Sequence, residues 1–190
     1  MVLSEIFKVT TLVFVINLNK NRMHDIGIFY GSTGGNTEAV AKQIKMALGT
    51  DNVHVFDVAE SDAGDLNQFS NIILGTSTWG IGDLQEDFEE FLNELDTATL
   101  TGKKVAIFGC GDQVNYPDSF VDGIGIIYET IVDKGSEIVG KISTDGYDYD
   151  ESRAEINGQF IGLPIDEDNQ YNLTTERIEK WVEQLKKQFV

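Results

Sequence analysis

The sequence contains very little cysteine, histidine or proline. Cys110 is the single cysteine in 190 residues, which excludes an internal disulfide and a CxxC metal site. The two histidines, His24 and His54, are too few for a histidine-based metal cluster. With 2 prolines and 41% hydrophobic residues, the composition excludes disordered and collagen-like chains. The length indicates one domain with a single substantial core.

Positive charge is also scarce. The chain has 14 Lys and Arg against 32 Asp and Glu, a formal net charge of -18. Such a surface repels nucleic acid and anionic membranes, so we expect neither as a partner. It attracts basic protein surfaces, and its self-repulsion favours a monomer.

Long apolar runs are absent as well. The apolar run over residues 9–18 is ten residues long, too short to span a membrane. It makes a poor signal peptide, because Lys8 is the only base near its start, Glu5 offsets that charge, and no small-x-small cleavage site follows. We therefore predict that residues 1–22 are an N-terminal extension preceding a domain over residues 23–190. A targeting segment is the alternative.

Strand-length apolar runs alternate with segments of helical period along the rest of the chain. This alternation predicts an α/β fold, a doubly wound five-stranded parallel sheet of order 2-1-3-4-5 with helices on both faces. Residues 146–164 break the alternation and predict an inserted excursion of short strands and loop between the fifth strand and the last helix. Strands are predicted over residues 25–30, 53–58, 72–74, 104–108 and 137–142, and helices over residues 36–48, 88–95, 120–132 and 174–189.

The first candidate loop is Gly-Ser-Thr-Gly-Gly-Asn-Thr, residues 31–37, between a strand and a helix. Its small residues expose backbone N–H groups at a helix N-terminus, where the helix dipole favours an anion. The side chains of Ser32, Thr33, Asn36 and Thr37 add further donors. The loop lacks the Walker ending and the GxGxxG spacing, so a single terminal phosphate fits best. The alternative is a glycine-rich turn with a helix cap.

Two further loops each carry an aromatic residue. Trp79 lies in residues 76–83 after the third strand, and Tyr116 lies in residues 109–116 after the fourth. Taken alone, Trp79 could close a hydrophobic edge and Tyr116 could be an ordinary surface tyrosine. Together with the first loop they meet at the carboxyl end of one sheet. A phosphate on a short tail, with a planar ring between two aromatics, describes FMN.

These stretches also resemble a known family. IGIFYGSTGGNTEAVAKQI resembles the flavodoxin phosphate signature, TSTWGIGDLQEDFEEF the loop with the inner flavin-stacking Trp, and FGCGDQVNYPDSFVDGIG the loop with the outer Tyr. Residues 144–185 resemble the long-chain subgroup, whose extra loop splits the fifth strand. The resemblance extends over residues 25–189.

The resemblance implies a cytoplasmic flavoprotein that is not an enzyme and binds FMN non-covalently. It would carry single electrons at low potential from a basic-surfaced reductase, such as a flavodoxin/ferredoxin NADP reductase, to low-potential acceptor enzymes. By resemblance, the FMN phosphate is held by Ser32, Thr33, Gly34, Gly35, Asn36 and Thr37. The flavin ring lies between Trp79 and Tyr116, and Asp168 lies near the ribityl and phosphate region. The edge of the ring meets the backbone of Thr78, Gly80, Ile81, Cys110, Gly111 and Asp112.

Two positions depart from the family pattern. Gly34 stands where Thr or Ser is usual, and the loss of one neutral hydrogen bond of roughly 1 kcal/mol would weaken FMN binding about fivefold. Cys110 stands where Thr is more usual. We expect it to be a small buried residue near the ring, with a redox-active thiol as the alternative.

The charge distribution indicates a low potential. Residues 46–102 hold twelve acids and no Lys or Arg. One carboxylate about 10 Å from the flavin, at an effective dielectric of about 40, opposes an added electron by roughly 0.8 kcal/mol, on the order of 35 mV. For most of these acids a solvated surface is the simpler explanation.

Two other functions share this fold. A flavodoxin-like NAD(P)H:quinone reductase needs a substrate pocket over the flavin, whereas Trp79 and Tyr116 are expected to cover both faces of the ring. A receiver-like signalling domain needs an Asp at the end of the third strand, and residues 74–76 there are Leu-Gly-Thr.

Overall fold

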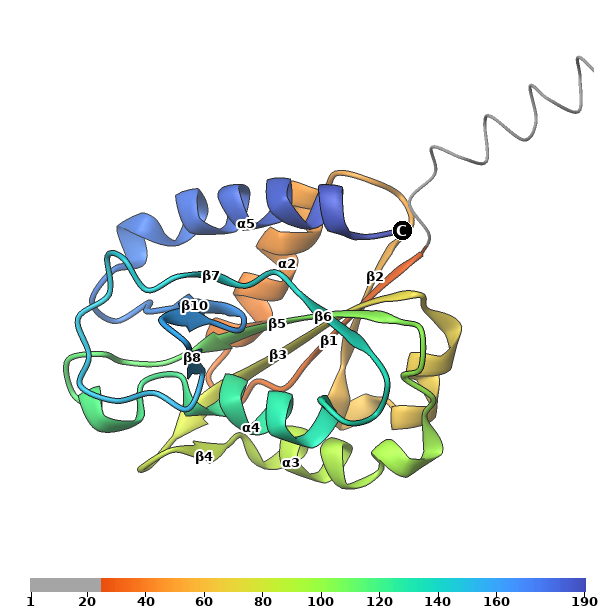
Figure 1. Ribbon diagram of the computed structural model, residues 1–190, viewed down its shortest axis with the longest axis horizontal. Coiled ribbons are helices and arrows are strands. Elements are labelled where there is room, and N and C mark those ends of the chain that lie inside the picture. Colours follow the sequence, from red (N-terminus) through yellow and green to blue (C-terminus); the bar gives the residue numbers. More distant parts are fainter. Residues whose placement is uncertain (1–24) are drawn as a thin grey trace, which may run out of the picture.

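The computed structural model describes residues 25–190, which form a central parallel sheet with helices on both faces (Figure 1). The predicted extension over residues 1–22 lies outside the described residues. The strand order β2-β1-β3-β5-β10 confirms the predicted doubly wound topology. These strands are β1 (Ile26–Tyr30), β2 (Val53–Asp57), β3 (Asn71–Trp79), β5 (Lys104–Cys110) and β10 (Leu163–Ile165).

Two pairs of helices cover the sheet. The α2 helix (Asn36–Leu48) and α5 (Thr174–Gln188) lie on one face, and α3 (Glu86–Asn93) and α4 (Asp122–Ile131) lie on the other (Figure 1). No helix among the described residues is long and apolar enough to cross a bilayer. Short 3-10 turns complete the connections at Val58–Glu60, Ala63–Gln68, Leu95–Thr97, Pro117–Ser119 and Tyr171–Leu173.

The central strands are buried on both faces, which explains their unbroken apolar runs. All five residues of β1 are buried. Ile26 and Ile28 belong to the core under α2 and α5, whereas Phe29 belongs to the core under α3 and α4. Successive side chains of one strand therefore anchor both helical layers.

Two strands extend further than the sequence predicted. The ladder between β3 and β5 continues through the pairs Thr76–Gly109 and Ser77–Cys110, because each strand has a partner there. Trp79 is accordingly the last residue of β3 and not a loop residue. A short strand, β4 (Asp83–Leu84), then turns back antiparallel to the end of β3.

The fifth strand is split, as the family resemblance implies. A first piece, β6 (Glu137–Val139), pairs with the start of β5, and β10 pairs with its end. Between them, β7 (Ile142–Ser143), β8 (Glu155–Ile156) and β9 (Gln159–Phe160) form a small antiparallel sheet. We call residues 140–162 the insertion.

The predicted bounds of the insertion were wrong at both ends. Ile142 lies in β7 and not in the fifth strand, because the chain leaves the main sheet after Val139. Pro164, predicted to lie in the insertion, belongs to β10. The edge position of β10 tolerates a proline because one side of the strand needs no ladder donor.

Tyr147 fastens the insertion to the domain. Its hydroxyl donates to the carbonyl oxygen of Pro164 at 2.8 Å. The guanidinium of Arg177 on α5 lies 3.9 Å from the centre of the Tyr147 ring, and Arg177 Nη2 also donates to the carbonyl of Gly146 at 3.0 Å. The ring packs edge-on against Phe160 at a centroid distance of 5.2 Å. One side chain thus joins β10, α5 and the small sheet.

Tyr147→Phe removes the hydroxyl and leaves the ring in place. We expect the free energy of unfolding to fall by about 1 kcal/mol, because the carbonyl of Pro164 loses its donor. Urea denaturation measures the difference. Tyr171→Phe is the matched control, since Tyr171 is 71% exposed, and its midpoint should not change. Equal effects of the two substitutions would show that Tyr147 does not fasten the insertion.

Candidate functional site

Three loops and the segment after β10 enclose one pocket of about 320 Å³ at the carboxyl edge of the sheet. This is the edge at which doubly wound folds bind their ligands. The pocket brings together twelve of the residues singled out in the sequence: Ser32, Gly34, Asn36, Thr37, Thr78, Trp79, Gly80, Cys110, Gly111, Asp112, Tyr116 and Asp168.

Three other candidates do not line the pocket. Thr33 Oγ1 accepts from Gln85 Nε2 at 3.2 Å, so this hydroxyl faces the start of α3. Ile81 is 90% exposed, at the outer side of the turn between β3 and β4. Thr33, Gly35 and Ile81 are not among the lining residues, whereas Ser77, Ser119 and Glu167, which the sequence analysis did not select, are.

One end of the pocket is the N-terminus of α2. Gly35 caps this helix with φ +90°, a conformation that glycine adopts without strain. Its N–H donates to Ser32 Oγ at 3.1 Å, which closes the loop before the helix. A Cβ built at Gly34 would have no atom within 4 Å, so the position has open space around it. The free N–H groups and the helix dipole make this end a site for an anion.

The other end presents two half-exposed aromatic residues. Trp79 is 48% exposed, and its Nε1 donates to Ser77 Oγ at 2.8 Å, which fixes the orientation of the indole. Tyr116 is 51% exposed and lies in the loop after β5. Both side chains line the pocket, so it can accept a planar apolar group beside them.

Asp112 shapes the loop that carries Tyr116. Its Oδ1 accepts from the N–H groups of Val114 at 3.0 Å and Asn115 at 2.9 Å, and the backbone oxygen of Asp112 accepts from Tyr116 N at 3.1 Å. Partial burial raises the pKa of Asp112, but hydrogen bonds from Asn115, Asn169 and Val114 outweigh this and hold the pKa below its usual range. The carboxylate is therefore ionised at neutral pH.

Asp166, which the sequence analysis missed, links this loop to the segment after β10. It is fully buried, and its Oδ2 accepts from Gln113 Nε2 at 2.8 Å and Gln113 N at 3.2 Å. Its Oδ1 accepts from Asn169 N at 2.9 Å, and Asn169 Nδ2 bridges to Asp112 Oδ1 at 2.8 Å. Gln113 Oε1 in turn accepts from the N–H of Asp148 in the insertion at 2.7 Å. The position of an Asp directly after a strand was the signal available in the sequence.

The pocket is electronegative. Asp112, Glu167 and Asp168 line it, and among the described residues its lining includes no Lys, Arg or His. The described residues also include no group of three or more His, Cys, Asp or Glu placed to hold a metal ion. An anionic group in this pocket must therefore be held by N–H and hydroxyl donors alone.

Cys110 lies at the end of β5 and is buried. Burial raises the pKa of its thiol to about 12, a hydrogen bond with Thr37 opposes the rise, and the charges of Glu167 and Asp168 add to it. The thiol is protonated at neutral pH, which fits the expected small buried residue and not a reactive thiolate.

Comparison with known proteins places these features in a family. A family model described as Flavodoxin matches residues 28–181. The flavodoxin of a Nostoc species is 49% identical over 164 residues, covering 86% of this chain and 96% of that protein. The flavodoxin of Helicobacter pylori is 46% identical over 167 residues, covering 88% and 99%. A crystal structure of Fusobacterium nucleatum flavodoxin bound to flavin mononucleotide is 38% identical, with a TM-score of 0.84 over 88% of this chain and 100% of that one.

The raised pKa of Cys110 predicts slow reaction with thiol reagents. At pH 8 the thiolate fraction of a group with a pKa of about 12 is about 10⁻⁴, so iodoacetamide labelling should be at least about a hundredfold slower than in urea. The rate should still be rising above pH 10. Mass spectrometry reports on this residue alone, because it is the single cysteine. Labelling in the folded protein at the rate of the unfolded chain would contradict the assignment.

Proposed function

The chain belongs to the flavodoxin family, and we propose that it binds FMN in this pocket and carries single electrons at low potential between partner proteins. The observation that carries the proposal is the pairing of a helix N-terminus with two half-exposed aromatic side chains in one pocket. When bound, FMN supplies reversible one-electron chemistry. The protein is an electron-transfer protein and not an enzyme.

The phosphate end of the pocket suits a group with a single terminal charge. The N–H groups that begin α2 are donors, and the dipole of a 13-residue helix adds to them. We assign the phosphate to Ser32, Gly34, Asn36 and Thr37, with Thr33 contributing through its backbone N–H group and Gly35 through its place as the N-cap of α2. No cation is required for this mode of binding, which fits a lining without Lys or Arg.

The aromatic end suits the flavin ring. We assign the two faces of the ring to Trp79 and Tyr116. The ring edge would meet the backbone of Thr78, Gly80 and Ile81 on one side. On the other side it would meet Cys110, Gly111 and Asp112, with Asp168 nearer the ribityl chain. The half exposure of both aromatic side chains leaves the ring close to the surface, as electron transfer between proteins requires.

Negative charge around the pocket supports a low potential. Asp112, Glu167 and Asp168 are in the lining itself. One carboxylate about 10 Å from the ring opposes an added electron by about 35 mV. No basic side chain of the lining compensates them. The acids therefore disfavour the fully reduced, anionic flavin.

Further assignments follow from charge and topology. The split fifth strand with its insertion supports placement in the long-chain subgroup. The net charge of -18 favours basic-surfaced partners, such as a flavodoxin/ferredoxin NADP reductase and low-potential acceptor enzymes, and opposes self-association. We therefore propose a cytoplasmic monomer formed by a domain over residues 23–190.

The proposal is tested by anaerobic stepwise reduction of the purified protein, with chromatography of the released cofactor. We expect FMN and a visible spectrum that passes through a distinct one-electron stage. Bleaching in one two-electron step, with turnover of NADPH and a quinone, would instead indicate the flavodoxin-like quinone reductase. A colourless protein that takes up no added FMN would refute the assignment of the pocket.

Gly34→Ser should strengthen FMN binding. The open space at Gly34 admits a hydroxyl beside the phosphate site, and one added hydrogen bond of about 1 kcal/mol corresponds to about a fivefold lower Kd. Fluorescence titration of the FMN-free protein measures the constant. Gly34→Ala is the control, because it adds the Cβ without the hydroxyl. If the two variants bind equally, the missing donor does not limit affinity.

FMN affinity should also rise with salt. FMN is an anion and the pocket holds three carboxylates without a cation, so screening between about 0.01 M and about 0.3 M NaCl should lower the Kd several-fold. Asp168→Asn should tighten binding at low salt and reduce this dependence. Isothermal titration at several salt concentrations measures both effects. Affinity that falls with salt would mean that a cation outside the described lining holds the phosphate.

A further inference from the structure

The turn that follows Trp79 is held at both ends by the start of α4. Before the turn, Thr78 Oγ1 accepts from Gly123 N at 3.0 Å. After the turn, a Cβ built at Gly82 would lie 2.8 Å from Asp122 Oδ2, so the carboxylate packs directly on this glycine. Gly82 has φ +115°, is buried, and donates its N–H to the carbonyl of Trp79 at 3.1 Å. Consecutive residues of α4 therefore contact both ends of the turn.

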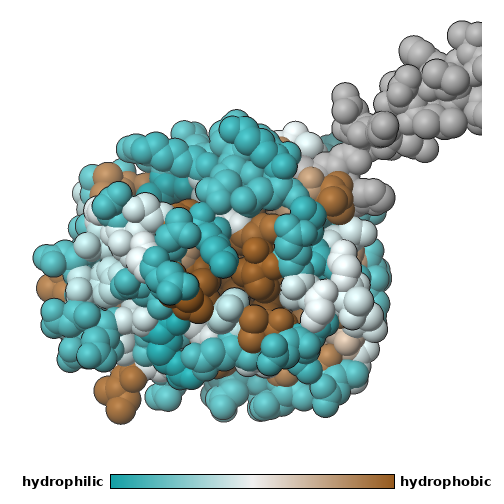
Figure 2. All heavy atoms as spheres, in the orientation of Figure 1, coloured by the Kyte–Doolittle hydropathy of each residue, from teal (hydrophilic) through white to brown (hydrophobic). Residues whose placement is uncertain are grey.

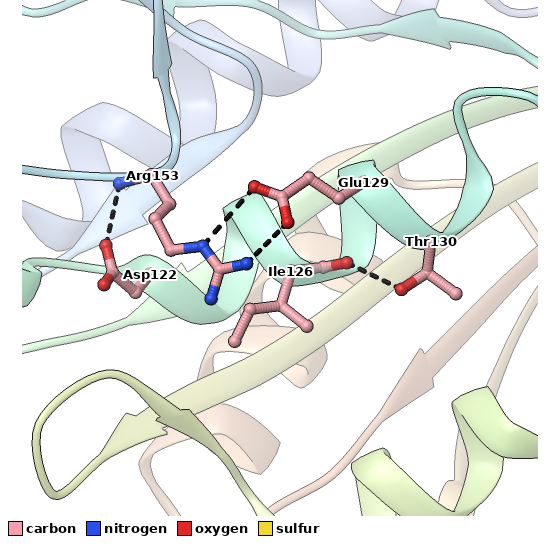
Figure 3. A network of polar contacts seen from close by, with 5 residues as sticks. All are labelled: Asp122, Ile126, Glu129, Thr130 and Arg153. Carbon is pink, nitrogen blue, oxygen red and sulfur yellow. Dashed lines mark hydrogen bonds and ion pairs between the residues drawn. The ribbon is translucent and has the colours of Figure 1, made fainter.

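Asp122 is itself held by the insertion. Its Oδ1 accepts from the backbone N–H of Arg153 at 2.7 Å, while the Arg153 guanidinium pairs with Glu129 on α4 (Figure 3). The insertion and the helix are in close backbone contact here, because a Cβ at Gly125 would lie 2.5 Å from Arg153 Cβ. The Arg153 N–H thus has a fixed position relative to the helix.

Three further hydrogen bonds hold residues 150–153 of the insertion, which we call the strap, against the segment before α4. The N–H groups of Asp150 and Glu151 both donate to the carbonyl of Pro117 at 3.0 Å, and Ser152 Oγ donates to the carbonyl of Phe120 at 2.5 Å. The strap is therefore fastened independently of Asp122.

The insertion also borders α5. In the space-filling view the insertion and α5 lie around a hollowed apolar area (Figure 2).

The environment of Asp122 restricts its carboxylate to these contacts. The residue is 7% exposed. Burial raises the pKa of Asp122, although the N–H and guanidinium of Arg153 lower it. A buried carboxylate is costly unless it is hydrogen-bonded, so the bond from Arg153 N determines which way Oδ2 points. Oδ2 points at Gly82.

We propose that Asp122 is a positioning residue, which transmits the position of the insertion to the turn Trp79–Gly82 and so fixes the part of the pocket beside Trp79. The inference rests on the proposed function in one respect, namely that the ligand which the turn contacts is FMN. The turn would border the ring edge, where reduction changes charge and protonation. A loosened turn should therefore alter FMN affinity unequally in the oxidised and one-electron-reduced states.

Hydrogen exchange of the Gly82 amide tests the restraint without FMN. In the full-length, FMN-free protein, Asp122→Ala should accelerate this exchange at least tenfold, measured by NMR at constant pH. Asp122→Asn keeps a side-chain oxygen that can accept from Arg153 N, so its Gly82 exchange rate should stay within threefold of the wild type. Glu129→Gln is the matched control, because it breaks the half-exposed ion pair of the same network and should change the exchange less than twofold.

A second variant acts from the insertion side. Gly125→Ala leaves Asp122 in place but pushes the Arg153 backbone away from α4, and it should accelerate Gly82 exchange at least fivefold. This variant carries the test if Asp122→Ala does not fold. Unchanged exchange in both variants, or equal acceleration by Asp122→Asn and Asp122→Ala, would overturn the proposal.

The FMN-loaded protein provides the second readout. Asp122→Ala should change the ratio of the two FMN dissociation constants at least threefold, which appears as a shift of about 30 mV in the first midpoint potential. Glu129→Gln should leave this potential unchanged. An unchanged potential in Asp122→Ala would refute the effect on the cofactor. If the wild type binds no FMN, the proposed function fails, and the exchange experiment still decides the role of Asp122.

Discussion

The buried carboxylate of Asp166 is the contact on which the rest of the site depends. A carboxylate without exposure to water must be fully hydrogen-bonded, and its partners here come from two segments distant in sequence. Gln113 reaches it from the loop that carries Tyr116, and Asn169 reaches it from the segment that carries Asp168. Through Gln113 the insertion is joined to the same centre. One buried side chain therefore holds together two of the segments that line the pocket and joins the insertion to them.

The insertion has a second role in this arrangement, because it is joined to both aromatic segments. Its Asp148 N–H bonds to Gln113 in the Tyr116 loop, and its Arg153 N–H bonds to Asp122 of α4, which packs on the Trp79 turn. Both bonds use backbone donors, so they depend on the path of the insertion more than on its side chains. A carrier that exchanges electrons without rearranging needs such a preformed pocket. Because β6 and β10 both pair with β5, the insertion leaves the sheet after β6 and rejoins it at β10 while the sheet stays continuous.

Residue periodicity was enough to predict the sheet order and the helices, because these depend on local pattern. The rule that parallel strands end at one edge was enough to predict that Trp79 and Tyr116 lie at the same edge of the sheet, where both line one pocket. Their role toward FMN stays a prediction. The direction of individual side chains was not predictable, and Thr33 turns to Gln85 because a buried amide needs a partner. Asp166 and Asp122 were missed because their partners lie 53 and 31 residues away, beyond any local pattern. The split of the fifth strand was expected only through the family resemblance.

The most direct test of the central role of Asp166 is the FMN dissociation constant of Asp166→Asn, measured beside Asp118→Asn. Both substitutions remove one negative charge, but Asp118 is exposed and Asp166 is buried among donors that an amide NH₂ group would oppose. We expect Asp166→Asn to weaken FMN binding at least tenfold, with a loss of about 3 kcal/mol in the free energy of unfolding, and Asp118→Asn to bind FMN at least as well as the wild type. FMN binding by Asp166→Asn with the affinity of the wild type would contradict this account of the site.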